Sequence, residues 1–166
     1  MSDSITIASR LKVYERGIFN LDELYKAIKG WLVFEGFGDH EKTFREESYV
    51  ERIKGDAKQI EIKWKAEKLI NEYISYVLTI TYNINGLTEI EIEQDGRKIK
   101  MNKGLVIIFI SSKIILDRQD KWKSDFFRSI YENLIIREKI EAHKEDLYNK
   151  TYKLQNELKA FFDMNR

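Results

Sequence analysis

The chain has no cysteine and no proline, and only eight glycines occur among its 166 residues. The absence of cysteine excludes a disulfide framework, a cysteine-bound zinc site and thiol catalysis, and it is typical of a reducing cytoplasm. Because proline is absent and glycine is scarce, flexible linkers and low-complexity tails are not expected. The length fits a single domain, 1–166, that can form a core without a metal.

Neither sign of charge dominates, since 29 basic residues stand against 28 acidic ones. The net charge therefore creates no field that would attract nucleic acid or an anionic membrane. No uncharged apolar run approaches the ~20 residues that a membrane-spanning helix needs, and residues 1–10 lack the pattern of a secretion signal. We expect a cytoplasmic protein with no membrane span and no nucleic-acid partner.

The first elements follow from a change of periodicity. Apolar and polar residues alternate over 5–14, which predicts a strand with one apolar face. The spacing then becomes helical. Asn20 fits an N-cap and Glu23, three residues later, completes a capping box. This helix is expected to end near Gly36 or Gly38, because glycine commonly follows the last turn of a helix.

Residues 41–116 carry patterns that predict six consecutive strands. The alternation over 41–54 is weak and lies among charges, as in an edge strand that resists intermolecular pairing. The next two runs alternate clearly and are separated by a short loop at 69–71. That loop would place Trp64 opposite Tyr76 and would match every apolar pair on one face.

Two later turn signals differ in quality. Asp95-Gly96 predicts a type I′ turn that brings opposite charges together, for example Glu93 with Lys98. Asn85-Gly86 would place apolar residues opposite glutamates, so we predict a bulge or a longer connection there. Segment 105–116 is apolar on both faces except for Ser111, Ser112 and Lys113, which is typical of a strand that is covered on both sides or leaves the sheet.

The C-terminal segment, 124–163, has a helical pattern that begins at a plausible cap, Ser124. One long helix and two abutting helices both fit, with a bend near 134–136. The predicted fold class is therefore α+β: a curved antiparallel sheet of about seven strands, in the order strand-helix-six strands-helix, packed on a long C-terminal helix.

This element order resembles the helix-grip fold of the START-like and pollen-allergen superfamily, which implies a curved sheet wrapped around the C-terminal helix. Short words of the sequence also resemble a loose group of uncharacterised archaeal proteins. That second resemblance implies a prokaryotic-type cytosolic setting and no known activity. The words are FNLDELYKAIKGWL, IEIKWKAEKLINEY, DGRKIKMNKG and LYNKTYKLQNELKAFF.

No motif for catalysis or for a cofactor occurs, so neither a cofactor nor a metal is expected. His40 and His143 are far apart in the sequence, and each is predicted to be a solvated residue. The basic clusters at 97–103 and 118–128 are interleaved with acidic residues. We interpret both clusters as solvated surface rather than as RNA contacts.

Two candidate sites remain. Trp64, Tyr76, Tyr82 and Ser111 combine bulky apolar surface with hydroxyl groups, as a pocket for a small apolar ligand would. In the alternative interpretation, the C-terminal helix fills the same space as an ordinary core. The sequence leaves both open.

The second candidate site is the end of the C-terminal helix, where Leu158, Phe161 and Phe162 are expected to extend past the sheet and contact a protein partner or a second copy. Three functional hypotheses follow. The first is a non-catalytic binding module that presents a sheet–helix groove to a protein partner or a small apolar ligand. The second is an assembly subunit that oligomerises through its C-terminal helix, and the third and weakest is a START-like enzyme without a recognisable motif.

Overall fold

The computed structural model of the protein describes residues 3–38, 42–122 and 124–164. It is an α+β structure with one antiparallel sheet of five strands in the order β1-β5-β4-β3-β2. A short α-helix and a π-helical turn, η1, precede the long C-terminal helix. The elements are β1 (Asp3–Phe19), α1 (Leu21–Phe34), β2 (Phe44–Lys54), β3 (Ala57–Leu69), β4 (Ile74–Gln94), β5 (Arg97–Leu116), α2 (Asp125–Ile130), η1 (Tyr131–Ile135) and α3 (Arg137–Met164).

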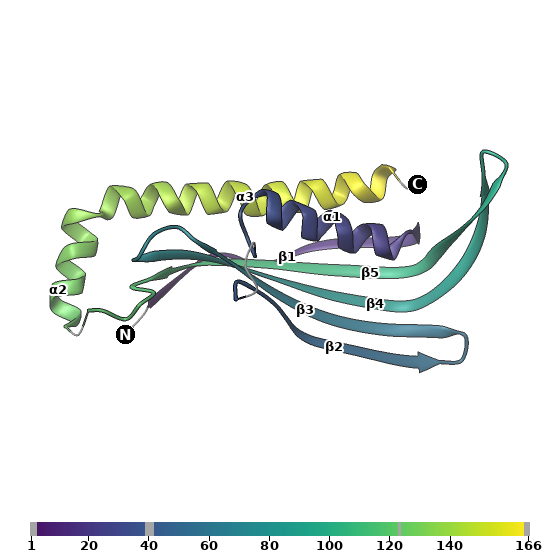
Figure 1. Ribbon diagram of the computed structural model, residues 1–166, viewed down its shortest axis with the longest axis horizontal. Helices are drawn as coiled ribbons and strands as arrows, with labels where there is room; N and C mark the ends of the chain where they lie inside the picture. The colour runs from purple at the N-terminus through teal and green to yellow at the C-terminus, as the bar shows by residue number, and fades with distance from the viewer. Residues whose placement is uncertain (1–2, 39–41, 123, 165–166) are drawn as a thin grey trace.

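Helices α1 and α3 lie on the same face of the sheet, as Figure 1 shows. The core is the layer between them and the inward side chains of the strands, because burying apolar surface is the main force that holds such layers together. Hairpin residues 87–102, which we call the arm, reach beyond the other strands and curl toward the helix side. The buried core residues of α3 are Ile140, Leu147, Leu154, Leu158 and Phe162.

The sheet has five strands where seven are predicted, because the connections expected at 85–86 and at 102–104 do not interrupt β4 or β5. At Asn85-Gly86 the ladder continues after a register shift between Asn85 and Thr88, so the predicted bulge is confirmed. Gly104 lies across from it. A Cβ atom on Gly104 would lie 3.0 Å from the backbone oxygen of Asn85, so the close approach of the two strands requires glycine.

Two hairpins test the predicted pairings. The Asp95-Gly96 turn is confirmed, with Glu93 opposite Lys98. The register predicted for β3 and β4 is wrong, since Trp64 lies opposite Ile80 rather than Tyr76. Both registers place apolar residues opposite one another on the same face, so polarity alone cannot choose between them.

Helix α1 begins and ends where the sequence predicts. The side chain of Asn20 accepts a hydrogen bond of 3.1 Å from the backbone N–H of Glu23. At the other end Gly36 has a φ of +85°. The N–H of Phe37 donates to the carbonyl of Leu32 at 2.7 Å, as in a Schellman motif.

The predicted bend in the C-terminal segment is present. Ile136 leaves helical geometry, with φ −114° and ψ 10°, and separates η1 from α3. As a result, α2 turns away from α3 and passes the end of the sheet (Figure 1). The bend creates a corner in which side chains from distant parts of the chain meet.

The end of α3 does not extend past the core, which corrects the expectation for the partner surface. Leu158 is 2% exposed and Phe162 is 3% exposed. The Phe162 ring lies edge-on to Phe19, with 6.2 Å between centroids. Only Phe161 is half-buried, and it lines a groove of about 200 Å³ between α1 and α3. Helix α1 covers this end of α3, and sequence periodicity could not show that.

Candidate binding pocket

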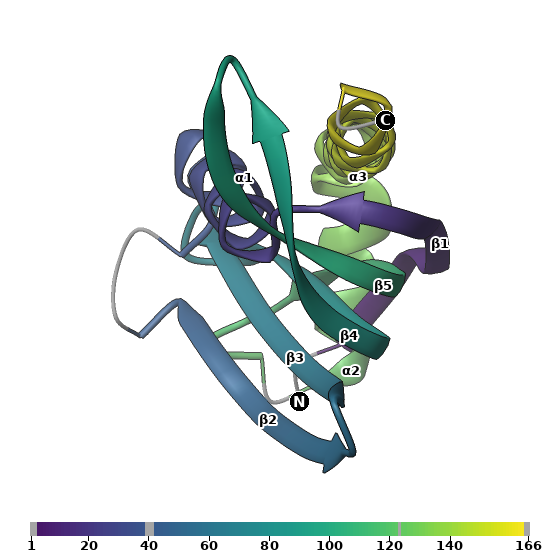
Figure 2. The same ribbon diagram turned by 90° about the vertical axis from the view of Figure 1, so that its right-hand side faces the viewer.

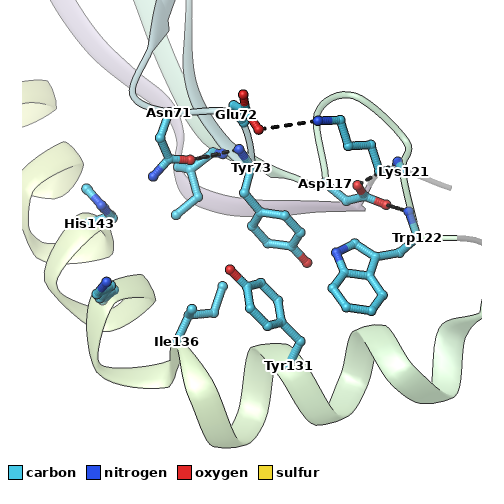
Figure 3. A pocket seen from close by; sticks show the side chains of 11 residues that line it. Asn71, Glu72, Tyr73, Asp117, Lys121, Trp122, Tyr131, Ile136 and His143 are labelled. Atoms are coloured by element: carbon cyan, nitrogen blue, oxygen red, sulfur yellow. Dashed lines mark hydrogen bonds and ion pairs between the residues drawn. The ribbon is translucent and has the colours of Figure 1, made fainter.

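A pocket of about 440 Å³ lies at the end of the sheet, inside the bend of the C-terminal segment. We call it the elbow pocket. The β3–β4 turn, the segment that follows β5, and the η1–α3 corner each contribute a wall (Figure 3). Its main lining residues are Tyr73, Asp117, Trp122, Tyr131, Lys139 and His143.

The β3–β4 turn is fixed by a side chain. The Asn71 carboxamide oxygen accepts hydrogen bonds of 2.8 Å from the backbone N–H groups of Tyr73 and Ile74. Arg118, in the segment that follows β5, also holds the turn: its backbone N–H donates to the carbonyl of Tyr73, and its Nε donates to the carbonyl of Asn71. These bonds orient Tyr73 toward the pocket, because an asparagine that caps its own turn restricts the local backbone.

The segment after β5 is held by Asp117, which is buried. Its carboxylate accepts hydrogen bonds from the backbone N–H groups of Lys121, at 2.9 Å, and Trp122, at 3.2 Å. Charge-assisted bonds of this kind are stronger than those between neutral groups. They place the indole of Trp122 against the pocket.

Three aromatic rings form one wall, and Figure 3 shows them gathered at its centre. Tyr131 lies between the others: its centroid is 5.2 Å from that of Trp122, which is stacked on it, and 5.3 Å from that of Tyr73, which meets it edge-on. The Tyr73 hydroxyl donates to Glu132. Burial, and then this hydrogen bond, raise the pKa of Tyr73 above its usual value. The phenol therefore stays neutral and the wall uncharged apart from Glu132.

The opposite wall belongs to α3 and contains His143. Its Nδ1 lies 2.7 Å from the hydroxyl oxygen of Tyr76, and the Tyr76 hydroxyl donates to Asp146 at 3.0 Å. Because Tyr76 has only one hydroxyl proton, His143 Nδ1 carries the proton in its own bond and donates it to Tyr76. This leaves His143 Nε2 for another partner.

The sequence interpretation of His143 as a solvated residue is therefore wrong, since the side chain is half-buried and hydrogen-bonded. His40 lies outside the described residues. Lys123, from the basic cluster at 118–128, also lies outside the described residues. Trp122, from the same cluster, lines the elbow pocket.

No protein-family model matches this chain, and no curated protein matches its sequence. Its function is therefore inferred from geometry. Among the described residues, no group of three or more histidine, aspartate and glutamate side chains is placed to hold a metal ion. None of the described helices is both long enough and apolar enough to span a membrane.

Acid–base chemistry is not favoured at Tyr76. Burial, and then the hydrogen bond to Asp146, raise the pKa of its hydroxyl above the usual value. A general acid or base works best when its pKa is near the operating pH. Tyr76 therefore stays protonated: its hydroxyl donates to Asp146 and accepts the hydrogen bond that positions His143.

The four predicted ligand residues do not surround one cavity. The ring centroid of Trp64 lies 4.9 Å from that of Tyr82 and 5.8 Å from that of Tyr25, so aromatic side chains occupy this part of the core. Ser111 lies on the opposite face of the sheet, where its hydroxyl accepts a hydrogen bond from the N–H of Arg10 at 3.0 Å. Of these four residues, only Tyr76 is connected to the elbow pocket, through its hydrogen bond with the pocket residue His143.

Sequence reasoning missed Tyr73, Tyr131 and the role of His143. One signal was available, because Lys139 and His143 are one helical turn apart and therefore share a face of α3. The other walls come from segments separated by dozens of residues. No local pattern indicates that they meet.

The Tyr76 environment gives a prediction for alkaline pH. The unfolded chain loses the phenol proton near pH ~10, whereas the folded chain keeps it, because the pKa of Tyr76 is raised. The protonated phenol therefore makes its full contribution to the unfolding free energy below about pH 10. This contribution is lost as the pH rises from about 10 toward the pKa of Tyr76 in the folded chain. In Tyr76→Phe, the fall of the unfolding free energy between about pH 10 and 11 should be shallower by up to about 1.4 kcal/mol per pH unit.

Urea unfolding at stepped pH measures this slope, and the exposed Tyr14→Phe serves as the control. An unchanged slope in Tyr76→Phe would contradict the arrangement of Tyr76 and Asp146 described above.

Proposed function

We propose that the protein is a non-catalytic binding module whose elbow pocket takes a small planar ligand carrying an anionic group. The observation that carries the proposal is the pairing of an aromatic wall with Lys139 and His143 on the facing helix. Pockets of this kind bind the apolar body of a ligand by contact and fix its orientation with a few polar groups.

The anionic preference follows from which charges already have partners. Glu72 pairs with Lys121 at 3.3 Å, Asp117 accepts two backbone N–H groups, and Glu132 accepts from Tyr73. Within the described part of the chain, Lys139 makes no ion pair and His143 Nε2 has no hydrogen bond. The Lys139 ammonium suits an anion such as a carboxylate or a phosphate, whereas Nε2 of the neutral His143 ring can accept a hydrogen bond from a donor group on the ligand.

The helix-grip resemblance supports this proposal in a limited way. The protein has a sheet carrying a C-terminal helix, and the first strand pairs with the last. The proposed site differs from the one expected from the sequence, since it lies beside the start of α3 rather than beneath the helix. A cytoplasmic setting, expected from the lack of cysteine, belongs to the same proposal.

The dye anilinonaphthalene sulfonate tests the pocket, because it is a planar aromatic anion that fluoresces in apolar surroundings. We expect saturable binding to the wild type. Lys139→Gln should weaken it by about tenfold, the cost of about 1.5 kcal/mol for one lost charge-assisted hydrogen bond. Trp122→Ala should weaken it further by removing ring contact.

Two controls locate the dye. Lys159→Gln removes the same charge from an exposed position of α3 and should leave the affinity unchanged. Phe127→Ser alters the outward side of α2, which is exposed. If Phe127→Ser abolishes binding while Lys139→Gln does not, the dye binds outside the elbow pocket and the proposal fails. Native mass spectrometry of freshly purified protein provides an independent test for a retained small molecule.

A second candidate function is self-association, and a specific observation favours it. The outward side of α2 and η1 carries Phe126, 69% exposed, Leu134, 78% exposed, and Ile135, 66% exposed. Contiguous apolar groups on a surface mark interaction sites. The assembly hypothesis is thereby moved from the end of α3 to the α2–η1 segment.

Light scattering tests this candidate. The wild type should have the mass of a dimer at micromolar concentration, and Phe127→Ser combined with Leu134→Ser should give a monomer with an unchanged circular dichroism spectrum. The exposed Phe34→Ser, on α1, is the matched control and should remain dimeric. A monomeric wild type would exclude the candidate.

A further inference from the structure

The face of the sheet opposite α1 and α3, which we call the outer face, combines basic and aromatic side chains. Figure 2 shows both helices on one side of the strands, and no described helix covers the middle of the other side. The pairing registers place Lys12 next to Phe109 and Tyr14 next to Ile107 on this face. Thr81 and Asn83 of β4 continue the same two rows.

Charge on the outer face of β1, β4 and β5 is segregated, although the whole chain is nearly neutral. On the same face, β3 carries Glu61 and Glu67 beside Lys63 and Lys65. Within the described residues, every charged side chain on the outer face of β1, β4 and β5 is a lysine or an arginine. These cationic residues are Arg10, Lys12, Arg16, Arg97, Lys103 and Lys113. None of the six forms an ion pair with a described carboxylate.

The local backbone directs one of these cations onto an aromatic ring. β1 has a bulge between Ala8 and Leu11, and Arg10 within it has a φ of +53°. Its guanidinium lies 4.2 Å from the centroid of Phe109. Bulges commonly re-aim a side chain in this way. A guanidinium stacked on a ring keeps its other flat face available to a second planar group.

A second copy of the chain does not suit the outer face. Stacking two such faces would bring unpaired lysines and arginines toward one another, which is unfavourable at short distance. Yet Ile107 and Tyr14 offer apolar surface between the cations, and Tyr14 is 51% exposed. The chemistry therefore matches a partner that is itself both anionic and apolar, with flat groups between its charges.

We propose that the outer face binds single-stranded nucleic acid. Arg10, Lys12 and Lys113 contact phosphates, and bases stack on Tyr14 and on the Arg10–Phe109 pair. The hydroxyl and amide groups of Thr81 and Asn83 meet base edges. Sheets use this division of roles because every base has a flat face and every nucleotide carries a phosphate. The site is independent of the elbow pocket.

This inference departs from the expectation of no nucleic-acid partner, which rested on net charge and on basic clusters within short segments. Lys12 and Lys113 are distant in the sequence, and pairing of β1 with β5 brings their strands together. Acidic residues that separate basic ones in the sequence point to the other face or lie on other strands.

Fluorescence anisotropy with labelled oligo-U and oligo-dT of about 12 nucleotides tests the proposal on the full chain. If three phosphates are neutralised, the affinity should fall about 20-fold between ~50 and ~200 mM salt. Lys12→Gln with Lys113→Gln should reduce the slope of log affinity against log salt by about 1.4. Tyr14→Ser should weaken binding at least about fivefold through lost stacking.

The matched control is Lys29→Gln with Lys159→Gln, which removes the same charge from exposed positions on the helix side. It should leave the salt slope unchanged. Equal effects of both double variants, or no binding at ~50 mM salt, would overturn the proposal. Phosphatidylserine vesicles that bind more tightly than either oligonucleotide, with the same variant dependence, would replace it with an anionic membrane surface.

Discussion

Replacing Leu158 with glutamate is expected to lower the free energy of unfolding by about 4 kcal/mol or more. Leu158 is 2% exposed and belongs to the core between α3 and α1. A carboxylate there would lose its hydration without gaining a partner, a change that ranks among the most destabilising single substitutions. Since domains are stable by only about 5–15 kcal/mol, much of the protein would unfold in mild denaturant. Urea unfolding followed by circular dichroism measures the loss.

The control is Lys159→Glu, one residue further along α3 at an exposed position. It introduces the same side chain and should change stability by less than about 0.5 kcal/mol. If Leu158→Glu remained as stable as the control but changed the oligomeric mass, Leu158 would be a partner contact, as the sequence predicts, and the packing of α3 described here would be wrong.

Gly104→Val is expected to destabilise the protein by about 2–3 kcal/mol. A Cβ atom at this position meets only backbone, namely the Asn85 oxygen at 3.0 Å and the Leu87 Cα at 3.2 Å. Backbone in a paired strand cannot rotate away as a side chain can, so the bulge must shift and the strands must separate. Hydrogen exchange should then become faster in the arm, 87–102, than in the rest of the sheet.

Gly30→Ala is the matched substitution within α1. Nothing lies within 4 Å of its added Cβ, and the position is helical. This variant should be more stable than the wild type by about 0.5–1 kcal/mol, because alanine favours the helix and restricts the unfolded chain. Faster exchange outside the arm, or a neutral Gly104→Val, would contradict the role assigned to Gly104.

Local chemistry predicted those parts of the fold that depend on a few neighbouring residues. Asn20 caps α1, and Asp95-Gly96 closes the arm with Glu93 opposite Lys98. The register of β3 against β4 depends on which of two acceptable pairings the turn selects. The Asn71 side chain makes that selection through two backbone hydrogen bonds, and alternation carries no information about it.

The elbow pocket was less predictable than the fold, because its walls meet only after the chain bends at Ile136. Tyr76 lies on the apolar face of β4, and its hydroxyl forms hydrogen bonds with His143 and Asp146. Trp64 and Tyr82 have the composition of a binding site, yet they contact each other. Composition does not show whether aromatic rings leave a space or fill it.

Strand β1 has one neighbour in the sheet, and that neighbour is β5: Asp3 lies opposite Leu116. During synthesis, the first strand must therefore wait for the last. At 5–20 residues per second, the intervening chain takes about 5–20 s to leave the ribosome. Throughout that interval β1 has no strand to pair with, so its exposed edge is a ready target for other nascent chains or for a chaperone. Translation sets the length of this delay, and β1 pairs only when a loop that spans most of the chain closes.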